Sequence, residues 1–322
     1  MIERPSHIPD YFLELYMSVV KEFSNWRADR FVSHKIPRLS RTKVQKILKT
    51  LAFDQNGNPV KPNRILKTGD LIILYKEPPV EPEVNTDFTV VYEDEWYIAV
   101  NKPPRLPVHP TAKYLKNTLT HLLALKYGED MSPTLVHRLD SETSGIVLCA
   151  KTRDAERAGK LLFEKREVKK EYKAIVRGIV NPPDGRINLP LSPDPTTIIK
   201  ARMWCKTEDG LPSLTDYETI SRGKKHTFLR LMPKTGRQHQ LRVHLDHIGH
   251  TIVGDKLYGP DKDIFIDYMQ DGLTDDVIRR AGHTRHALHA YKLQLIHPFT
   301  EKKLIIEAPM PQDMWDLLDK HL

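Results

Sequence analysis

A proline-interrupted acidic stretch at residues 77–87 constrains the fold most, because it divides the chain into two unequal parts. It reads EPPVEPEVNTD, and Pro78, Pro79 and Pro82 have no backbone N–H to donate to a helix or a sheet. A segment of this composition is a semi-rigid spacer between domains. We therefore expect an N-terminal extension at residues 1–26, a small domain at 27–76, a linker at 77–87 and a larger domain at 88–322.

The small domain concentrates the positive charge. Residues 27–76 hold 12 Lys or Arg and three Asp, a net charge of 12 − 3 = +9, whereas the whole chain carries +8. The remaining residues are therefore close to neutral. A basic helix alone would be read as a solvated surface, but +9 over a domain-sized unit favours binding to nucleic acid. Ser40 is a natural N-cap for the helix LSRTKVQKILKTL, and LIILY at 71–75 predicts a strand.

Composition excludes several other classes of protein. No apolar run approaches the length that spans a membrane, and the first 20 residues lack the pattern of a secretion signal. They predict a polar lead followed by a short amphipathic helix. Cys149 and Cys205 have no paired spacing, so we expect neither a disulfide framework nor a thiolate metal site. The expected location is the reducing cytoplasm.

The stretch LVHRLDSETSGIVLCAK, residues 135–151, places polar residues between two apolar runs typical of buried strands. Asp140 lies among turn-forming residues where the first strand ends, so its carboxylate is expected to be well held and partly dry. Ser144 lacks the surroundings of a Ser nucleophile and is expected to cap the turn. Gly145 is expected to adopt a conformation closed to other residues.

The rest of the larger domain predicts strands interrupted by a few helices. A hairpin is expected at FTVVYEDEWYIAVNKP and a helix at KTRDAERAGKLLFEKREV. KKEYKAIVRGIV predicts a strand, HTFLRLMPKTGRQHQLRVHLDHIGH a strand followed by a helix, and the C-terminal segments HALHAYKLQLIHPFT and KKLIIEAP two more strands. This order fits an α+β domain with a mixed, mostly antiparallel sheet.

Two evenly spaced histidine sets raise the question of a metal. His244, His247 and His250 form one set, and His283, His286 and His289 form the other. Neither set has the H-E-x-x-H arrangement or a neighbouring Cys pair. We therefore predict no metal site and interpret these histidines as surface or RNA-facing residues. The chain also lacks the glycine-rich phosphate and dinucleotide loops, and no cofactor is expected.

Four motifs in order resemble the RluA family of RNA pseudouridine synthases. HRLDSETSGIVLCAKT resembles the catalytic motif of that family, and EYKAIVRG its second motif. The third motif is matched by KTGRQHQLRVHLDHIGHTIVGDKLYG, and the C-terminal strands by RHALHAYKLQLIHPFTEKKLIIEAP. His250-Thr251 departs from the usual His-Pro. In the small domain, RADRFVSHKIPRLSRTKVQKILK resembles the S-four-type RNA-binding domain. The resemblance implies a pseudouridine-synthase-like α+β catalytic domain preceded by a small α/β RNA-binding domain.

The resemblance also implies an activity and a set of site residues. The enzyme would break the glycosidic bond of a uridine, rotate the base and rejoin it through carbon, in ribosomal or transfer RNA and without a cofactor. Asp140 corresponds to the family's catalytic aspartate, Arg242 to the basic residue that pairs with it, and Tyr172 to the active-site tyrosine. Arg138, two residues before Asp140, would point to the same side and contact RNA where the uridine leaves its stack. The protein is expected to be a monomer.

Two other functions stay open at this point. One is a non-catalytic RNA-binding or ribosome-associated protein that has kept the fold. The other is a hydrolase that cleaves a glycosidic bond in nucleic acid, which usually needs a second carboxylate. Glu142 is the nearest candidate for that role, but a spacing of two residues from Asp140 within a turn argues against the pair.

Overall fold

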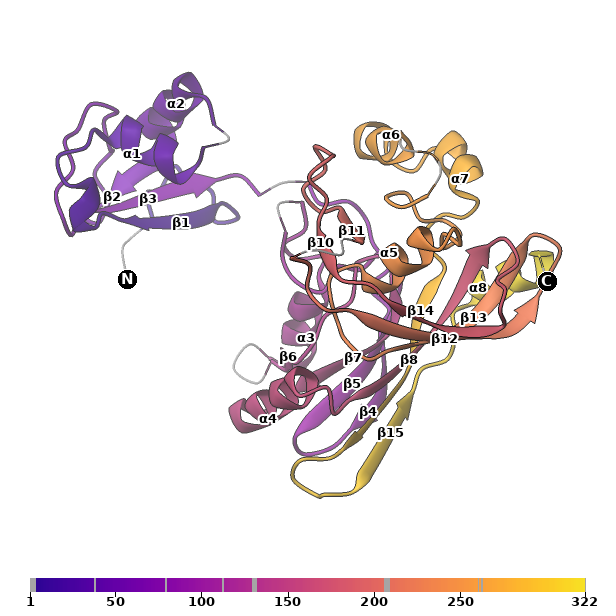
Figure 1. The fold of residues 1–322 in the computed structure, drawn as a ribbon. Coiled ribbons are helices and arrows are strands. Elements are labelled where there is room, and N and C mark those ends of the chain that lie inside the picture. Colours follow the sequence, from indigo (N-terminus) through magenta and orange to yellow (C-terminus); the bar gives the residue numbers. More distant parts are fainter. Residues whose placement is uncertain are drawn as a thin grey trace. The chain divides into compact units, whose positions relative to one another are not determined.

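The computed structural model describes residues 4–37, 39–78, 80–111, 113–128, 132–205, 209–259, 261 and 263–321. The chain forms two compact units, Met1–Val80 and Glu81–Leu322 (Figure 1). Arg38, one of the basic residues of the small domain, and Pro79 of the linker lie outside the described residues.

The first unit begins earlier than predicted. Strand β1, Leu13–Ser18, lies inside the expected N-terminal extension and pairs antiparallel with β3, Leu71–Lys76. The prediction of an amphipathic helix here was wrong. Apolar and polar residues alternate along LELYMS with the period of a strand, and β3 supplies the hydrogen-bonding partner that local sequence cannot reveal.

The first unit packs helices α1 and α2 on a three-stranded sheet of order β1-β3-β2. Ser40 caps α2 by accepting the backbone N–H of Lys43, as predicted, and Val44 and Leu48 are fully buried. Leu39, immediately before the cap, packs into the same core, so the apolar face of α2 fixes the helix against the sheet. The remaining elements of this unit are η1 Lys21–Phe23, α1 Ala28–Lys35, α2 Arg41–Leu51 and β2 Ala52–Asp54.

The second half of the expected linker belongs to the larger unit. The carboxylate of Glu81 accepts the backbone N–H groups of Lys116 and Asn117, each at 2.8 Å. Val84 packs against an apolar core of the same unit. Residues 81–87 are therefore held by specific contacts, and the free part of the spacer is shorter than its composition suggests.

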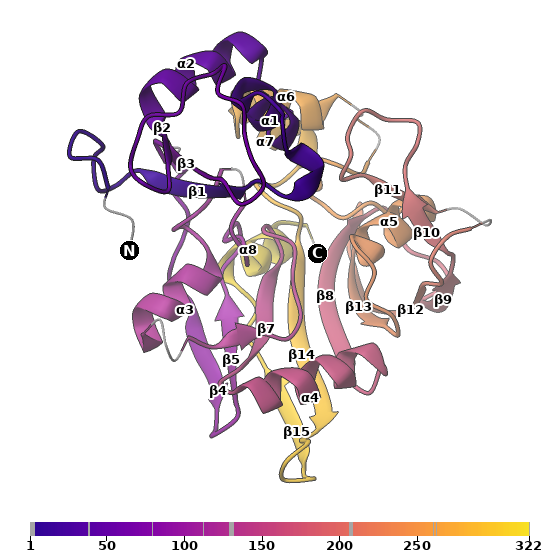
Figure 2. The same ribbon diagram turned by 90° about the vertical axis from the view of Figure 1, so that its left-hand side faces the viewer.

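The larger unit is built on a mixed sheet whose path runs β4-β5-β7-β14-β8-β13-β12-β9, with β15 beside β14 and β6 beside β7 (Figure 2). Among the described strands β7 and β14 pair in parallel and the other pairs are antiparallel. The predicted α+β class with a mixed, mostly antiparallel sheet is confirmed. The strands are β4 Thr89–Glu93, β5 Tyr97–Lys102, β6 Thr134–Leu135, β7 Ser144–Ala150, β8 Lys169–Arg177, β9 Asp184–Asn188, β12 Leu214–Arg222, β13 His226–Pro233, β14 Leu288–Ile296 and β15 Lys303–Glu307, with a separate pair β10 Leu191–Pro193 and β11 Met203–Cys205.

Helices cover the sheet where its side chains are apolar. Leu119 and Leu123 of α3 join one core against β5 and β7, and Ala155 of α4 joins another. Leu241 of α5 and Met314 of α8 pack into a third core, against β8 and β13. In the part of the chain that the structure describes, no helix combines the length and apolar character needed to span a membrane. The helices are α3 Leu119–Tyr127, α4 Arg153–Glu164, α5 Gln240–His247, α6 Ile264–Asp271, α7 Asp275–Ala281 and α8 Gln312–His321.

The parallel pair β7–β14 is made possible by a glycine. Ser144 lies opposite His289 and Gly145 opposite Ala290. Gly145 has φ = +111°, and a Cβ built there would lie 2.2 Å from the backbone oxygen of Ala290. The predicted need for glycine at this position is confirmed, for a positive φ and for close approach of two backbones.

Candidate active site

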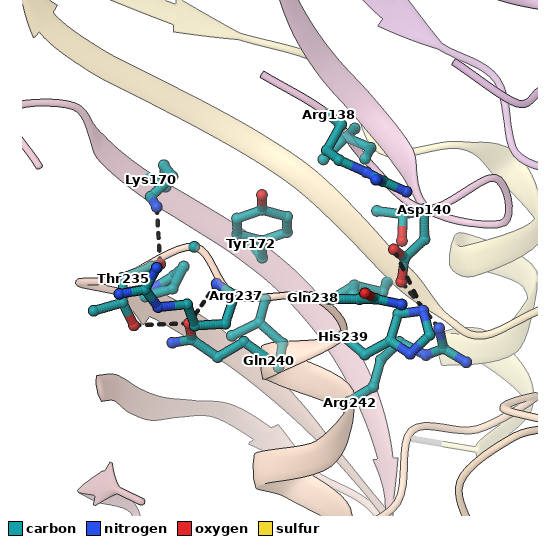
Figure 3. Close-up of a pocket in the computed structure, with 16 residues that line it drawn as sticks. Arg138, Asp140, Lys170, Tyr172, Thr235, Arg237, Gln238, His239, Gln240 and Arg242 are labelled. Carbon is teal, nitrogen blue, oxygen red and sulfur yellow. Dashed lines mark hydrogen bonds and ion pairs between the residues drawn. The ribbon is translucent and has the colours of Figure 1, made fainter. Parts of the chain in front are cut away.

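Asp140 lies in the loop between β6 and β7, at the edge of a pocket in the larger unit (Figure 3). Its neighbour Leu139 is buried in the core below, which fixes the backbone of the loop. The carboxylate itself is 23% exposed, and its Oδ2 accepts a hydrogen bond of 2.9 Å from Nη1 of Arg242. The structure thus brings together two residues that are 102 positions apart in the sequence.

Arg242 is buried on α5 and connects two carboxylates. Its Nε and Nη2 donate to the two oxygens of Asp255, at 2.6 and 2.9 Å, while Nη1 is left for Asp140. Burial alone would raise the pKa of Asp255, but the charge and hydrogen bonds of Arg242 hold that pKa below its ordinary value. Asp255 was not predicted from the sequence, although it lies in the quoted segment IVGDKLYG.

Tyr172 enters the same pocket from β8. Its ring packs partly on two apolar cores, so it does resemble an ordinary strand tyrosine on one side. The other side faces the pocket, where Figure 3 shows it between Lys170 and Asp140. Burial raises the pKa of the Tyr172 phenol, so the group stays protonated at neutral pH. The pocket is lined by Arg138, Leu139, Asp140, Thr143, Lys170, Tyr172, Pro233, Thr235–Leu241, Arg242 and Leu288.

Another wall is the loop after β13, which is fixed by Gln240. The Gln240 Oε1 accepts from the hydroxyl of Thr235 at 2.7 Å and from the backbone N–H of Arg237 at 3.0 Å. Lys170 of the neighbouring strand β8 donates to the backbone oxygen of Thr235, and burial lowers the pKa of this ammonium to about 8. The pocket therefore has a preorganised polar wall and an apolar floor that includes Leu241 and Leu288, a combination suited to a flat heterocycle.

Comparison with known proteins shows which family this chain resembles. A family model described as RNA pseudouridylate synthase matches residues 96–247. An RNA pseudouridine synthase of Aquifex aeolicus (strain VF5) is 33% identical over 92% of this chain and 94% of its own length. Ribosomal large subunit pseudouridine synthase D of Buchnera aphidicola subsp. Schizaphis graminum is likewise 33% identical, again over 92% of this chain and 94% of its own.

The chain belongs to the RNA pseudouridine synthases. It is accordingly an isomerase that acts on RNA. Among solved structures, human RNA Pseudouridylate Synthase Domain Containing 1 is 26% identical, with a TM-score of 0.57 over 71% of this chain and 86% of that one. The expected fold and activity are therefore confirmed for the larger unit.

The residues that directly follow Asp140 in this synthase are held by different parts of the unit. Lys102, fully buried on β5, donates to the backbone oxygen of Ser141 at 2.9 Å. The Glu142 carboxylate pairs with Lys256 at 2.8 Å, and Thr143 shares a hydrogen bond of 2.7 Å with His286. The position of the Asp140 loop is thus set by β5, by the segment after α5 and by the segment just before β14.

Two predictions for individual polar residues were wrong. Ser144 does not cap a turn: it begins β7 and forms a hydrogen bond of 3.0 Å with His289. His244, His286 and His289 are buried, so the expectation of surface histidines was wrong for these three, whereas His247 is exposed. Tertiary partners decide both cases; for example, the two ring nitrogens of His244 bond Thr215 and the backbone oxygen of Leu189. Among the described residues no group of three or more His, Cys, Asp or Glu is arranged to hold a metal ion.

Arg138 is exposed and lines two adjoining cavities of the synthase, the pocket of Figure 3 and a second one that also includes Asp140. Its neighbour His137 points elsewhere: the ring stacks on Phe163 at 4.5 Å and accepts the backbone N–H of Leu148. Successive side chains of an extended segment point to opposite sides. His137 therefore packs inside the unit, while Arg138 faces the cavities.

Proposed function

We propose that this enzyme converts specific uridines of large-subunit ribosomal RNA to pseudouridine. Relatives from Buchnera aphidicola and from Neisseria meningitidis are named ribosomal large subunit pseudouridine synthase D, and their likeness extends over 92–94% of this chain. It therefore includes the basic first unit as well as the catalytic one, and this is the observation that carries the proposal. Transfer RNA is the second substrate class that the chemistry allows. Work on ribosomal RNA would place the enzyme in the cytoplasm.

We infer that Asp140 is the catalytic group. With Oδ2 bound to Arg242, the other oxygen, Oδ1, is the atom available to a substrate in the pocket. An aspartate carboxylate is ordinarily ionised at neutral pH, as a nucleophile or a base must be. Such a carboxylate can attack the anomeric carbon, attack the uracil ring or take a proton from the sugar.

The same contacts speak against a glycosidase. Such an enzyme usually uses a second carboxylate that is free to act as acid or base. Glu142, the nearest candidate, is engaged by Lys256 and by the backbone N–H of His286. Its part in this proposal is to hold the loop that carries Asp140.

The roles proposed for Tyr172 and Arg138 follow from where they lie. A protonated phenol at the pocket edge can stack on the face of a uracil and offer its hydroxyl to the base. The exposed guanidinium of Arg138, next to Asp140, can fill the gap left by the extracted base or bind phosphate. Either contact would offset part of the few kcal/mol that unstacking costs.

The first unit is proposed to be an S-four-type RNA-binding domain. Buried Asp29 of α1 holds Arg27 at 3.0 Å and Arg41 at 3.3 Å, so both guanidinium groups are oriented toward one groove. Arg30, which also lines that groove, stacks over Trp26 at 3.9 Å. Oriented Arg groups of this kind suit phosphate oxygens of RNA.

One experiment tests the substrate and the catalytic group together. Pseudouridine is mapped across total RNA from cells that lack the gene, and from the same cells supplied with the wild-type chain or with Asp140→Asn. We expect sites in large-subunit ribosomal RNA that vanish in the deletion, return with wild type and stay absent with Asp140→Asn. Sites confined to transfer RNA would reject the ribosomal substrate, and restoration by Asp140→Asn would remove Asp140 from catalysis.

A further inference from the structure

A chain of hydrogen bonds reaches the second oxygen of Asp140. The backbone N–H of Met203 donates to the hydroxyl of Tyr258 at 3.0 Å, and that hydroxyl lies 2.9 Å from Nδ1 of His239. Nε2 of the same imidazole lies 3.8 Å from Oδ1 of Asp140, the oxygen that Arg242 leaves free. None of these three contacts is needed for the ion pair with Arg242.

The contacts assign the proton of the imidazole. A backbone N–H can only donate, so Tyr258 accepts from Met203 and keeps its own proton for another acceptor. Burial raises the pKa of the Tyr258 phenol, which keeps that proton in place. In the described part of the chain, Nδ1 of His239 is the acceptor within its reach. Leaving the phenolic proton unbonded would cost about 1–3 kcal/mol, so Nδ1 accepts.

The imidazole must then carry its single proton on Nε2. Burial, aided by the charge of Arg242, lowers the pKa of His239 to about 4, so the ring is neutral under physiological conditions. Nε2 is the ring nitrogen that lies near Asp140. A separation of 3.8 Å is longer than a hydrogen bond, but catalytic hydrogen bonds are often long without substrate and shorten in the complex.

The backbone at His239 is held in an uncommon conformation. Its φ of 54° is left-handed, a region that residues other than Gly, Asn, Asp and His rarely adopt, and it directly precedes α5. Arg242 follows His239 by three residues, in the first turn of α5. The ring of Tyr258, whose hydroxyl contacts His239, also lies over the Arg242 guanidinium at 5.0 Å. Strained backbone of this kind persists where the surrounding structure over-determines it, commonly at active sites.

We propose that His239 is a positioning residue for Asp140, whose neutral Nε2–H binds Oδ1 when substrate is present and whose tautomer is fixed by Tyr258. The inference rests on the proposed catalytic role of Asp140. Arg242 and His239 would bind one oxygen each, so that the carboxylate keeps one orientation while the base is detached and rotated. Each carboxylate oxygen has two lone pairs, so Oδ1 can accept from His239 and still reach the substrate. Orientation by a group that does not itself react resembles the part that hydrogen-bonded partners play around other reactive side chains.

The test compares His239→Asn, Tyr258→Phe and the double variant. Asn tolerates the left-handed backbone but is too short to reach Asp140, and Phe keeps the ring over Arg242 while removing only the hydroxyl. His247→Asn is the matched control, because His247 is an exposed histidine at the end of α5. Activity is read as tritium released from total RNA labelled with uridine tritiated at C5, prepared from cells that lack the gene. Rejoining the base through C5 displaces that hydrogen.

We expect His239→Asn to lower kcat by about 10- to 100-fold with little change in KM. Tyr258→Phe should lower kcat less, and the double variant should be no slower than His239→Asn, because Tyr258 acts through His239. Nitrogen-15 spectra of the histidine side chains should show Nε2–H in wild type and a mixture of tautomers in Tyr258→Phe.

Three results would overturn the inference. They are a kcat for His239→Asn equal to that of His247→Asn, additive losses in the double variant, or an Nδ1–H tautomer in the wild-type enzyme. The tautomer is read without turnover, so the inference stays testable even if His239→Asn does not fold. An active Asp140→Asn would reject the proposed catalytic group instead, which keeps the two failures apart.

Discussion

At the scale of single residues, the guanidinium of Arg242 serves two carboxylates with different surroundings. Asp140 is partly open to the pocket, whereas the side chain of Asp255 has no exposed surface. Asp255 also accepts the backbone N–H groups of Leu257 and Tyr258, which ties the segment after α5 to the same cation. Arg242 therefore both stabilises the folded unit and orients its proposed catalytic group.

Arg242→Met is expected to abolish measurable tritium release and also to lower the free energy of unfolding by about 3–5 kcal/mol. The second effect arises because Asp255 would remain buried without its cation. Adding Asp255→Asn should recover part of that stability and none of the activity, since Asp140 still lacks its partner. Urea denaturation and tritium release measure the two effects. Wild-type stability in Arg242→Met would mean that the two backbone N–H groups satisfy Asp255 by themselves.

The sequence predicted the pair Asp140–Arg242 but not the residues around it. The pair came from two motifs that resemble a family, and the structure brings the side chains to 2.9 Å. Asp255 and His239 lie in the third of the quoted motifs, but nothing in it singled them out, because the first depends on a turn after a helix and the second on a left-handed backbone. Spacing along the chain does not encode either geometry.

At the scale of elements, β7 and β14 approach each other so closely at Gly145 that the sheet has no room for a side chain there. We expect Gly145→Ala to lower the free energy of unfolding by about 3 kcal/mol or more, because a Cβ would overlap the backbone of β14 and φ is positive. Gly249→Ala is the control: its φ is +82° and no atom lies within 4 Å of the added carbon. It should cost only the backbone strain, about 1–2 kcal/mol. Equal losses would show that the backbones can separate.

Helices α1 and α2 of the first unit are joined through Asp29, and this makes their stability depend on pH. The hydrogen bond from Arg27 holds the pKa of Asp29 well below its ordinary value, with Gln45 and Arg41 of α2 adding to the effect against the opposing influence of burial. A carboxylate with a lowered pKa contributes stability above the unfolded-state value near ~3.9, and that stability is lost as the pH falls.

Asp29→Asn should therefore destabilise the first unit by about 2 kcal/mol at pH 7, the scale of a hydrogen bond to a charged group. The difference from wild type should shrink as the pH falls below about 4. Pulse proteolysis in urea, read on peptides from residues 4–78, follows this unit within the intact chain. Asp10→Asn, an exposed aspartate of the same unit, is the control. If Asp29→Asn destabilised the unit equally at pH 7 and below about pH 4, the stability of the unit would not depend on the ionisation of Asp29.

Whether a segment forms a helix or a strand was largely predictable from the sequence. Which strands lie side by side in the sheets was not. The helix capped by Ser40, the β4–β5 hairpin and the strand–helix order at 226–247 follow from apolar spacing and turn residues, and the structure has all three. Strand β1 was predicted as a helix because its partner β3 lies far along the chain, beyond both helices of the unit. The insertion of β14 between β7 and β8 likewise depends on contacts that no local pattern contains.

At the scale of the whole molecule, the division into two units can be tested by removing the first. A chain that starts at Glu81 keeps the contacts of Glu81 with Lys116 and Asn117, so it should fold and still release tritium from RNA at high concentration. It should bind long structured RNA more weakly and with a shallower salt dependence. Each phosphate that the shortened chain no longer neutralises removes about 0.7–0.9 from the slope of log affinity against log salt concentration.

Binding of the full and shortened chains is measured across a salt series. An unchanged slope would mean that the basic first unit does not touch RNA. A chain that starts at Asp87 is the companion variant, because it lacks the Glu81 carboxylate and Val84. It should be less stable than the one starting at Glu81, and equal stability would mean that the contacts of residues 81–86 contribute nothing.

The parallel pairing of β7 with β14 has a consequence for synthesis of the protein. Asp140 and Arg242 emerge from a translating ribosome well before Leu288. The loop that carries Asp140 is nevertheless held by contacts of Thr143 with His286 and of Ser144 with His289. Ser144 and Gly145 of β7 pair with β14, whereas the earlier strand β6 pairs with β7 at its other end, at Cys149 and Ala150. Contacts of such long sequence separation form late. A nascent chain therefore carries both members of the proposed catalytic pair without a finished active site. If ribosomal RNA is the substrate, we expect the unfinished chain to be unable to modify it until the C-terminal strands have been translated.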